Sequence, residues 1–86
     1  MMYKFIKNVK YYYNNNFLEQ HKLETINFPT LESAKNYLNE ISLKYYYNKK
    51  YYSCYETAEI WEKTQTGYNI YSKSIDQKTG KEKKNY

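Results

Sequence analysis

Residues 29–44, PTLESAKNYLNEISLK, form the most regular stretch of the sequence and predict a single helix. Pro29 ends a preceding strand, and the side chain of Thr30 is suited to cap the free amide groups of the first helical turn. Apolar residues then recur at intervals of three and four, which places them on one narrow face of a helix. They are Leu31, Ala34, Leu38, Ile41 and Tyr45. We therefore expect a helix over 31–44 whose apolar face, Tyr45 included, packs in the core.

The segments on both sides of this helix alternate apolar and polar residues, which is typical of half-buried strands. We expect two strands before the helix, within 3–13 and 17–28, and two after it, within 51–63 and 68–75. Three asparagines, Asn14–Asn16, predict the turn between the first two strands, because asparagine tolerates left-handed backbone. A shift of phase between Leu23 and Ile26 indicates a bulge in the second strand.

This order of elements predicts an α+β fold of ββαββ type, in which one helix packs on a mostly antiparallel four-stranded sheet. We expect residues 1–75 to form this single small domain. The remaining residues, 76–86, are polar and rich in lysine. They predict either a loose tail or a short terminal hairpin arm.

The composition narrows the class of function. The chain has 86 residues and a formal net charge of +5, and all of its basic residues are lysines. It has a single cysteine, which excludes an internal disulfide framework and favours a reducing, cytoplasmic location. No continuous apolar segment reaches the length of a signal-peptide core or a membrane span, so we expect no membrane partner.

Catalytic patterns are weak throughout the sequence. His21 and Cys54 are the only histidine and thiol, and no glycine-rich turn adjoins Cys54 to supply an oxyanion hole. The acids Glu56, Glu59 and Glu62 lie on a predicted strand with a spacing that puts Glu59 opposite the other two. We therefore expect no enzyme, no metal site and no cofactor.

Tyrosine gives the strongest functional signal, with 14 residues in the chain. Neighbouring side chains diverge in a strand or a helix, so a run of tyrosines must expose some of its rings. Exposed rings beside lysines are typical of surfaces that grip proteins or stack on unpaired bases. The segment between the helix and the third strand is the richest. Its candidate binding residues are Tyr46, Tyr47, Lys49, Lys50, Tyr51 and Tyr52, and the Asn14–Asn16 turn with Tyr11–Tyr13 is the next candidate.

In size and composition the chain resembles the small, AT-rich proteins of bacteriophages and mobile elements, which include anti-CRISPR inhibitors of host defence. The resemblance implies a non-enzymatic inhibitor or adaptor that docks on a larger host protein or ribonucleoprotein. Two alternatives stay open. One is sequence-tolerant binding of single-stranded nucleic acid, because lysines hold phosphates without reading bases. The other is an assembly protein that self-associates through an open sheet edge.

Overall fold

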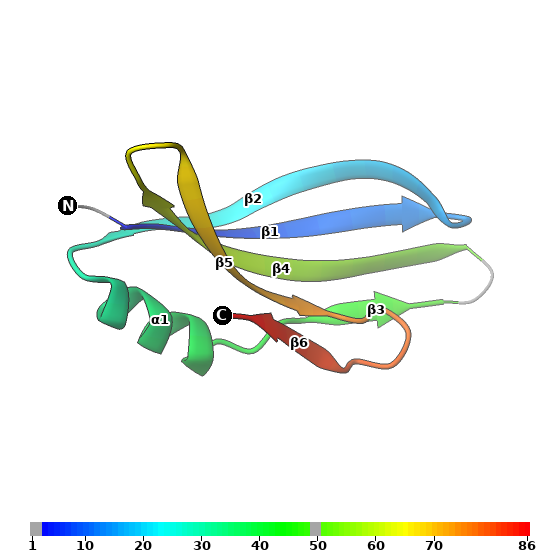
Figure 1. The fold of residues 1–86 in the computed structure, drawn as a ribbon. Coiled ribbons are helices and arrows are strands. Elements are labelled where there is room, and N and C mark those ends of the chain that lie inside the picture. The colour runs from blue at the N-terminus through cyan, green and yellow to red at the C-terminus, as the bar shows by residue number, and fades with distance from the viewer. Residues whose placement is uncertain (1–2, 49–50) are drawn as a thin grey trace.

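The computed structural model describes residues 3–48 and 51–86 of the chain (Figure 1). The described residues form a six-stranded antiparallel sheet with one short helix. The elements in chain order are β1 (Tyr3–Tyr13), β2 (Asn16–Phe28), α1 (Leu31–Glu40), β3 (Tyr45–Tyr47), β4 (Tyr52–Lys63), β5 (Tyr68–Ile75) and β6 (Glu82–Asn85). The expected ββαββ fold with a four-stranded sheet is therefore wrong, because the protein is mostly β and two further strands join the sheet.

The strand order of the sheet is β2-β1-β4-β5-β6, and β3 lies off this path. β4 organises the arrangement. One of its edges pairs with the whole of β1, while β5 and β3 share its other edge, at Thr57–Lys63 and Ser53–Tyr55 respectively. β6 pairs with the end of β5. Two strands are missing from the ββαββ expectation. β3 lies in the expected connection between the helix and the third strand, and β6 lies within 76–86, where a loose tail or a short hairpin arm is expected.

The first hairpin follows the sequence pattern closely. Asn14 and Asn15 adopt positive φ angles of 53° and 66°, which confirms the predicted asparagine turn between β1 and β2. The register of the pair shifts where Lys7 and Asn8 oppose Glu24 and Lys22, so Leu23 is the extra residue of a bulge. The bulge predicted for the second strand is thus confirmed.

The helix begins as predicted and ends early. The Thr30 hydroxyl accepts a hydrogen bond from the backbone N–H of Ser33 at 3.1 Å, which confirms the predicted cap. The helix ends at Glu40 rather than residue 44, because Ile41 is extended, with φ −71° and ψ 146°. This early exit turns Leu43 into the core, where it is 6% exposed. It also places Tyr45 in β3 with 44% of its surface exposed, so the expectation that Tyr45 belongs to the core is wrong.

The core lies between α1 and one face of the sheet. Ala34 and Leu38 of α1 are fully buried against a cluster that includes Phe5 and Ile60. A helix of this length spans about 15 Å, whereas the longest dimension of the molecule is 45 Å. The helix therefore covers only one end of one sheet face, as Figure 1 shows.

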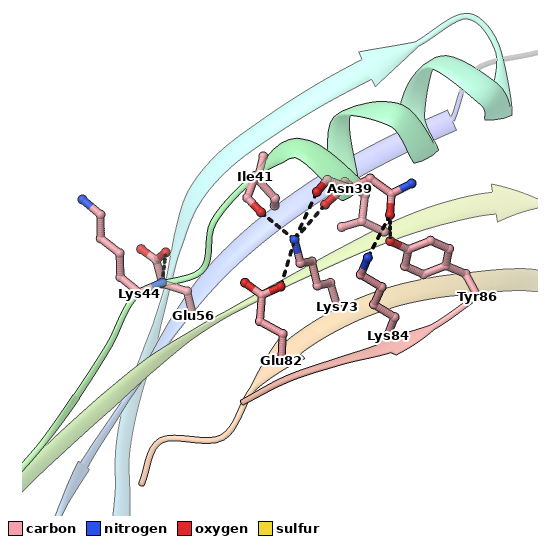
Figure 2. A network of polar contacts seen from close by, with 9 residues as sticks. Asn39, Ile41, Lys44, Glu56, Lys73, Glu82, Lys84 and Tyr86 are labelled. Carbon is pink, nitrogen blue, oxygen red and sulfur yellow. Dashed lines mark hydrogen bonds and ion pairs between the residues drawn. The ribbon is translucent and has the colours of Figure 1, made fainter. Parts of the chain in front are cut away.

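A buried lysine from β5 closes the end of the helix (Figure 2). Lys73 is 3% exposed, and its ammonium donates to the backbone carbonyls of Leu38, Asn39 and Ile41 at 3.4, 3.4 and 2.5 Å. The last turn of α1 contains no basic residue, so Lys73 supplies the cation that offsets the negative end of the helix dipole. The same ammonium lies 3.2 Å from the Glu82 carboxylate. Lys73 thereby joins α1, β5 and β6.

Further polar contacts of Asn39 and Glu56 fix the same region. Lys84 and Tyr86 both donate to the side-chain oxygen of Asn39 on α1, which draws β6 towards the helix (Figure 2). On the other side of the helix end, the Glu56 carboxylate accepts the backbone N–H of Lys44 at 2.9 Å. Glu56 also lies 3.4 Å from the ammonium of Lys7. These contacts hold the segment after α1 against the sheet.

Candidate functional site

The tyrosine segment singled out from the sequence lies at the end of the sheet away from α1 (Figure 1). Lys49 and Lys50 lie outside the described residues. Tyr46 and Tyr52 come together, with ring centroids 6.0 Å apart. Tyr47 points to the opposite face, because it pairs with Ser53 while Tyr46 pairs with Cys54. Tyr51 lies between β3 and β4 and is 57% exposed.

The second candidate segment from the sequence meets the first at this end. The ring of Tyr11 lies 6.0 Å from Tyr52 and 5.7 Å from the His21 ring. With Tyr46, these rings form a row across β2, β1, β4 and β3, on the face that carries α1. Burial raises the pKa of Tyr52. The backbone N–H of Asn14 donates to the carbonyl of Tyr51 at 2.8 Å, which ties the asparagine turn to the tyrosine segment.

The residues considered for catalysis are kept apart. His21 lies on β2 and Cys54 on β4, and β1 runs between these strands. Glu59 lies on the face opposite Glu56 and Glu62. Within residues 3–48 and 51–86, no three His, Cys, Asp or Glu side chains are grouped closely enough to hold a metal ion. The same residues include no helix that is long and apolar enough to cross a membrane.

The sheet face opposite α1, here called the open face, carries an excess of positive charge. Strand residues that share this face are identified by their cross-strand partners, which always point the same way. Its charged strand residues are Lys4, Lys10, Lys22, Lys63, Lys83 and Glu59, five lysines against one glutamate. The α1 face has the reverse balance, three lysines against five glutamates. These are Lys7, Lys73, Lys84, Glu19, Glu24, Glu56, Glu62 and Glu82.

One end of the open face combines these lysines with two aromatic rings, one exposed and one half-buried. Trp61 and Tyr68 pack edge to face with centroids 5.2 Å apart, and Tyr68 is 57% exposed. Together with Ile6, Lys4 and Lys63 they line a groove of about 340 Å³, here called the platform. The indole N–H of Trp61 has no hydrogen-bond partner among the described residues. This nitrogen is itself buried, so the platform offers ring faces and two cations in one place.

A second aromatic group lies further along the open face. The rings of Tyr12 and Tyr55 stack with centroids 5.8 Å apart, and their hydroxyl groups lie within 3.3 Å. The hydrogen bond with Tyr55 raises the pKa of Tyr12 above its ordinary value. Phe17 packs on the other side of Tyr12, and Lys10 is the cross-strand partner of Tyr55. Aromatic and basic side chains are thus grouped at two places on the face, with Ile6, Asn8, Thr57 and Glu59 between them.

Sequence reasoning missed Lys4, Lys10, Trp61, Lys63 and Tyr68 as site residues, although the signal was present. Alternation in 3–13 puts Lys4 and Lys10 in the phase away from the core. Alternation in 51–63 puts Tyr55 and Trp61 in one phase of the third expected strand. These lysines and rings can be assigned to one face only when the pairing of β1 with β4 is known, because that pairing sets Lys4 opposite Trp61 and Lys10 opposite Tyr55.

No protein-family model, no curated protein and no solved structure matches the chain. The chemistry of the two sheet faces is therefore the main guide to function. Of these, the open face has the stronger charge excess and is not covered by the helix.

Proposed function

We propose that the chain binds single-stranded nucleic acid, without sequence preference, on the open face. The observation that carries this proposal is the opposite charge balance of the two sheet faces, with the excess of lysine on the face that also carries half-buried Trp61 and exposed Tyr68. Proteins that bind single strands combine a positive surface that follows the backbone with aromatic rings on which bases stack. A sheet face of this kind suits unpaired bases, because duplex bases are already stacked on one another.

The absence of arginine also favours binding to phosphates over recognition of particular bases. All basic residues of the chain are lysines. The commonest specific base contact is a bidentate arginine on guanine, which this chain cannot make. Lysine ammonium groups contact phosphate as point charges and carry no sequence information. The binding we propose is therefore strong at low salt and similar for different sequences.

The test is the salt dependence of binding to a labelled 12-nucleotide thymidine strand, followed by fluorescence anisotropy. Each phosphate that a lysine neutralises contributes about −0.7 to the slope of log affinity against log salt. We expect Lys4→Ala with Lys63→Ala to make that slope shallower by about 1.4. The matched control is Lys44→Ala with Lys84→Ala, which removes equal charge from the α1 face and should leave the slope unchanged.

The stacking part of the proposal has its own variant. Tyr68 is exposed, so Tyr68→Ala should leave the thermal melt of the domain unchanged. Loss of one stacked base costs about 1–3 kcal/mol, so affinity should fall roughly 5- to 150-fold. Absence of oligonucleotide binding at 50 mM salt would contradict the proposed function. So would an equal loss of affinity in the Lys4/Lys63 variant and in its α1-face control.

A second candidate function is docking on a larger nucleic-acid-handling protein, as an inhibitor or adaptor. The observation that favours it is the cluster of exposed rings at the end of the sheet beyond α1, where Tyr13, Tyr46 and Tyr51 are 50, 52 and 57% exposed. Rigid, exposed tyrosines are the main contact residues of many protein-binding surfaces.

The variant Tyr46→Ala with Tyr51→Ala separates the two candidate functions. If these exposed tyrosines are a protein-docking hot spot, the variant should bind a purified partner protein more weakly by about 2 kcal/mol or more, which is roughly a 30-fold loss of affinity. It should keep wild-type affinity for the thymidine strand, because Tyr46 lies on the α1 face and Tyr51 precedes β4, outside the strand residues of the open face. Thermal melts of the variant serve as the folding control. Loss of strand binding here would mean that the nucleic acid lies on the α1 face instead.

A further inference from the structure

A large cavity adjoins the open face at the end opposite the platform. It has a volume of about 730 Å³ and lies between the strands of the open face and the turn that joins β5 to β6. The sheet side includes Lys10, Tyr55 and Thr57, and the turn side includes Thr79, Lys81 and Lys83. We call this cavity the hairpin pocket. Figure 1 shows the β5–β6 turn beside β3, at the same end of the molecule.

Contacts from β3 and β4 hold the turn side of the pocket in place. Gly80, with φ 74°, packs so closely on Tyr45 that a Cβ at this position would lie 2.5 Å from the tyrosine hydroxyl. The ammonium of Lys78 lies 5.8 Å from the centroid of the Tyr47 ring. The hydroxyl of Ser53 donates to Gln77 at 3.0 Å. The wall of the pocket is therefore preformed, and two tyrosines of the segment noted in the sequence serve to position it.

The free charge of the pocket is positive. Its acids already have partners within the chain. Asp76 accepts the backbone N–H groups of Thr79 and Lys78, which lower its pKa, and Glu82 pairs with Lys73. Within the described residues, Lys10, Lys81 and Lys83 form no ion pair. Hydroxyl groups of Thr57, Ser74 and Thr79 also line the pocket. Ammonium groups beside hydroxyls and a tyrosine ring fit a phosphate with its sugar and base.

We propose that the hairpin pocket takes one nucleotide of the strand whose other part lies on the platform, so that the open face is a two-part site. This inference rests on the proposed function. Tyr55 of the pocket and Trp61 of the platform share one face of β4 and are six residues apart, which corresponds to about 20 Å. A stacked single strand advances about 3.4 Å per nucleotide, so roughly six nucleotides span both parts.

The test is a length series of thymidine strands with 5′-phosphates, of 3, 6, 8 and 12 nucleotides, measured by competition at fixed salt. A trimer reaches only one part of the site. We expect affinity to rise about tenfold or more between 3 and 8 nucleotides and then to level off, because the second contact becomes intramolecular. Lys81→Ala with Lys83→Ala should remove most of this rise and leave trimer affinity nearly unchanged.

Two controls make the length series specific. Lys84→Ala removes the neighbouring charge of β6 from the α1 face, where Lys84 contacts Asn39, and should keep the wild-type length dependence. Lys81 and Lys83 are exposed, so the double variant should melt like the wild type. Equal affinity for trimer and octamer, or an unchanged rise in the double variant, would overturn the two-part site and leave the proposed function standing. Failure of every length to bind would overturn both.

Discussion

Leu38→Ala is expected to lower the free energy of unfolding by about 2–5 kcal/mol. Leu38 is fully buried and is one of the three largest side chains with no exposure, together with Phe5 and Ile60. Truncation removes apolar contacts and leaves a cavity between α1 and the sheet, which a thin core has little material to refill. A domain of this size has a total stability of about 4–13 kcal/mol, so the loss is a large share of it.

The measurement is chemical denaturation followed by far-ultraviolet circular dichroism. Leu18→Ala on β2 is the matched control, since Leu18 is 57% exposed and the substitution is chemically identical. We expect the control to change stability by less than about 0.5 kcal/mol. A Leu38→Ala midpoint equal to that of the control would mean that the apolar face of α1 does not hold the helix on the sheet.

The elements with an apolar period were predictable from the sequence. The limits of β1, β2, β4 and β5, the Thr30 cap and the asparagine turn follow from local residue preferences, and the structure has them within a few residues. Such features depend on neighbours in the chain, so a single sequence contains the information.

The missing strands depend on distant contacts. β6 reads EKKN and has no apolar alternation, and it pairs with β5 while Lys84 and Tyr86 contact Asn39 on α1. The apolar residues before β3 continue the helical spacing and so indicate more helix. In the structure, burial of Leu43 and the hydrogen bond from Lys44 to Glu56 favour an extended chain instead. The residues of 41–47 do not by themselves indicate a strand, and those of 76–86 leave a loose tail and a short hairpin arm as alternatives.

The candidate site shows the same division. The phases of Lys4, Lys10 and Trp61 along their own strands were visible, but their meeting on one face depends on which strands pair. The hairpin pocket was not predictable at all, because its sheet side comes from β1 and β4 and its other side from the distant turn between β5 and β6. Lys73 is the extreme case. Its sequence context is that of a surface lysine, and only the packing of α1 against β5 buries it.

Lys73→Met is expected to destabilise the domain by about 3 kcal/mol or more, which for a chain of this length lowers the melting temperature by roughly 12 °C or more. Methionine keeps most of the buried chain but removes the ammonium. The carbonyls of Leu38, Asn39 and Ile41 then lose the donor from β5, and the carboxylate of Glu82 loses its partner. Buried acceptors without donors and the uncompensated end of the helix dipole both raise the free energy of the folded state.

Lys84→Met is the matched control for this variant. Lys84 is the cross-strand partner of Lys73, carries the same charge and is exposed, so the same substitution there should cost less than about 1 kcal/mol. Glu82 is the first residue of β6, and its ion pair with Lys73 holds the start of that strand. We therefore also expect Lys73→Met to speed amide hydrogen exchange in β6 and at the end of α1 more than in β1. The substitution should also affect binding, because β6 carries Lys83, which lines the hairpin pocket. At temperatures where the variant is folded, it should bind trimers like the wild type and lose part of the gain for octamers. A Lys73→Met protein that melts like Lys84→Met would show that the ammonium does not hold α1, β5 and β6 together.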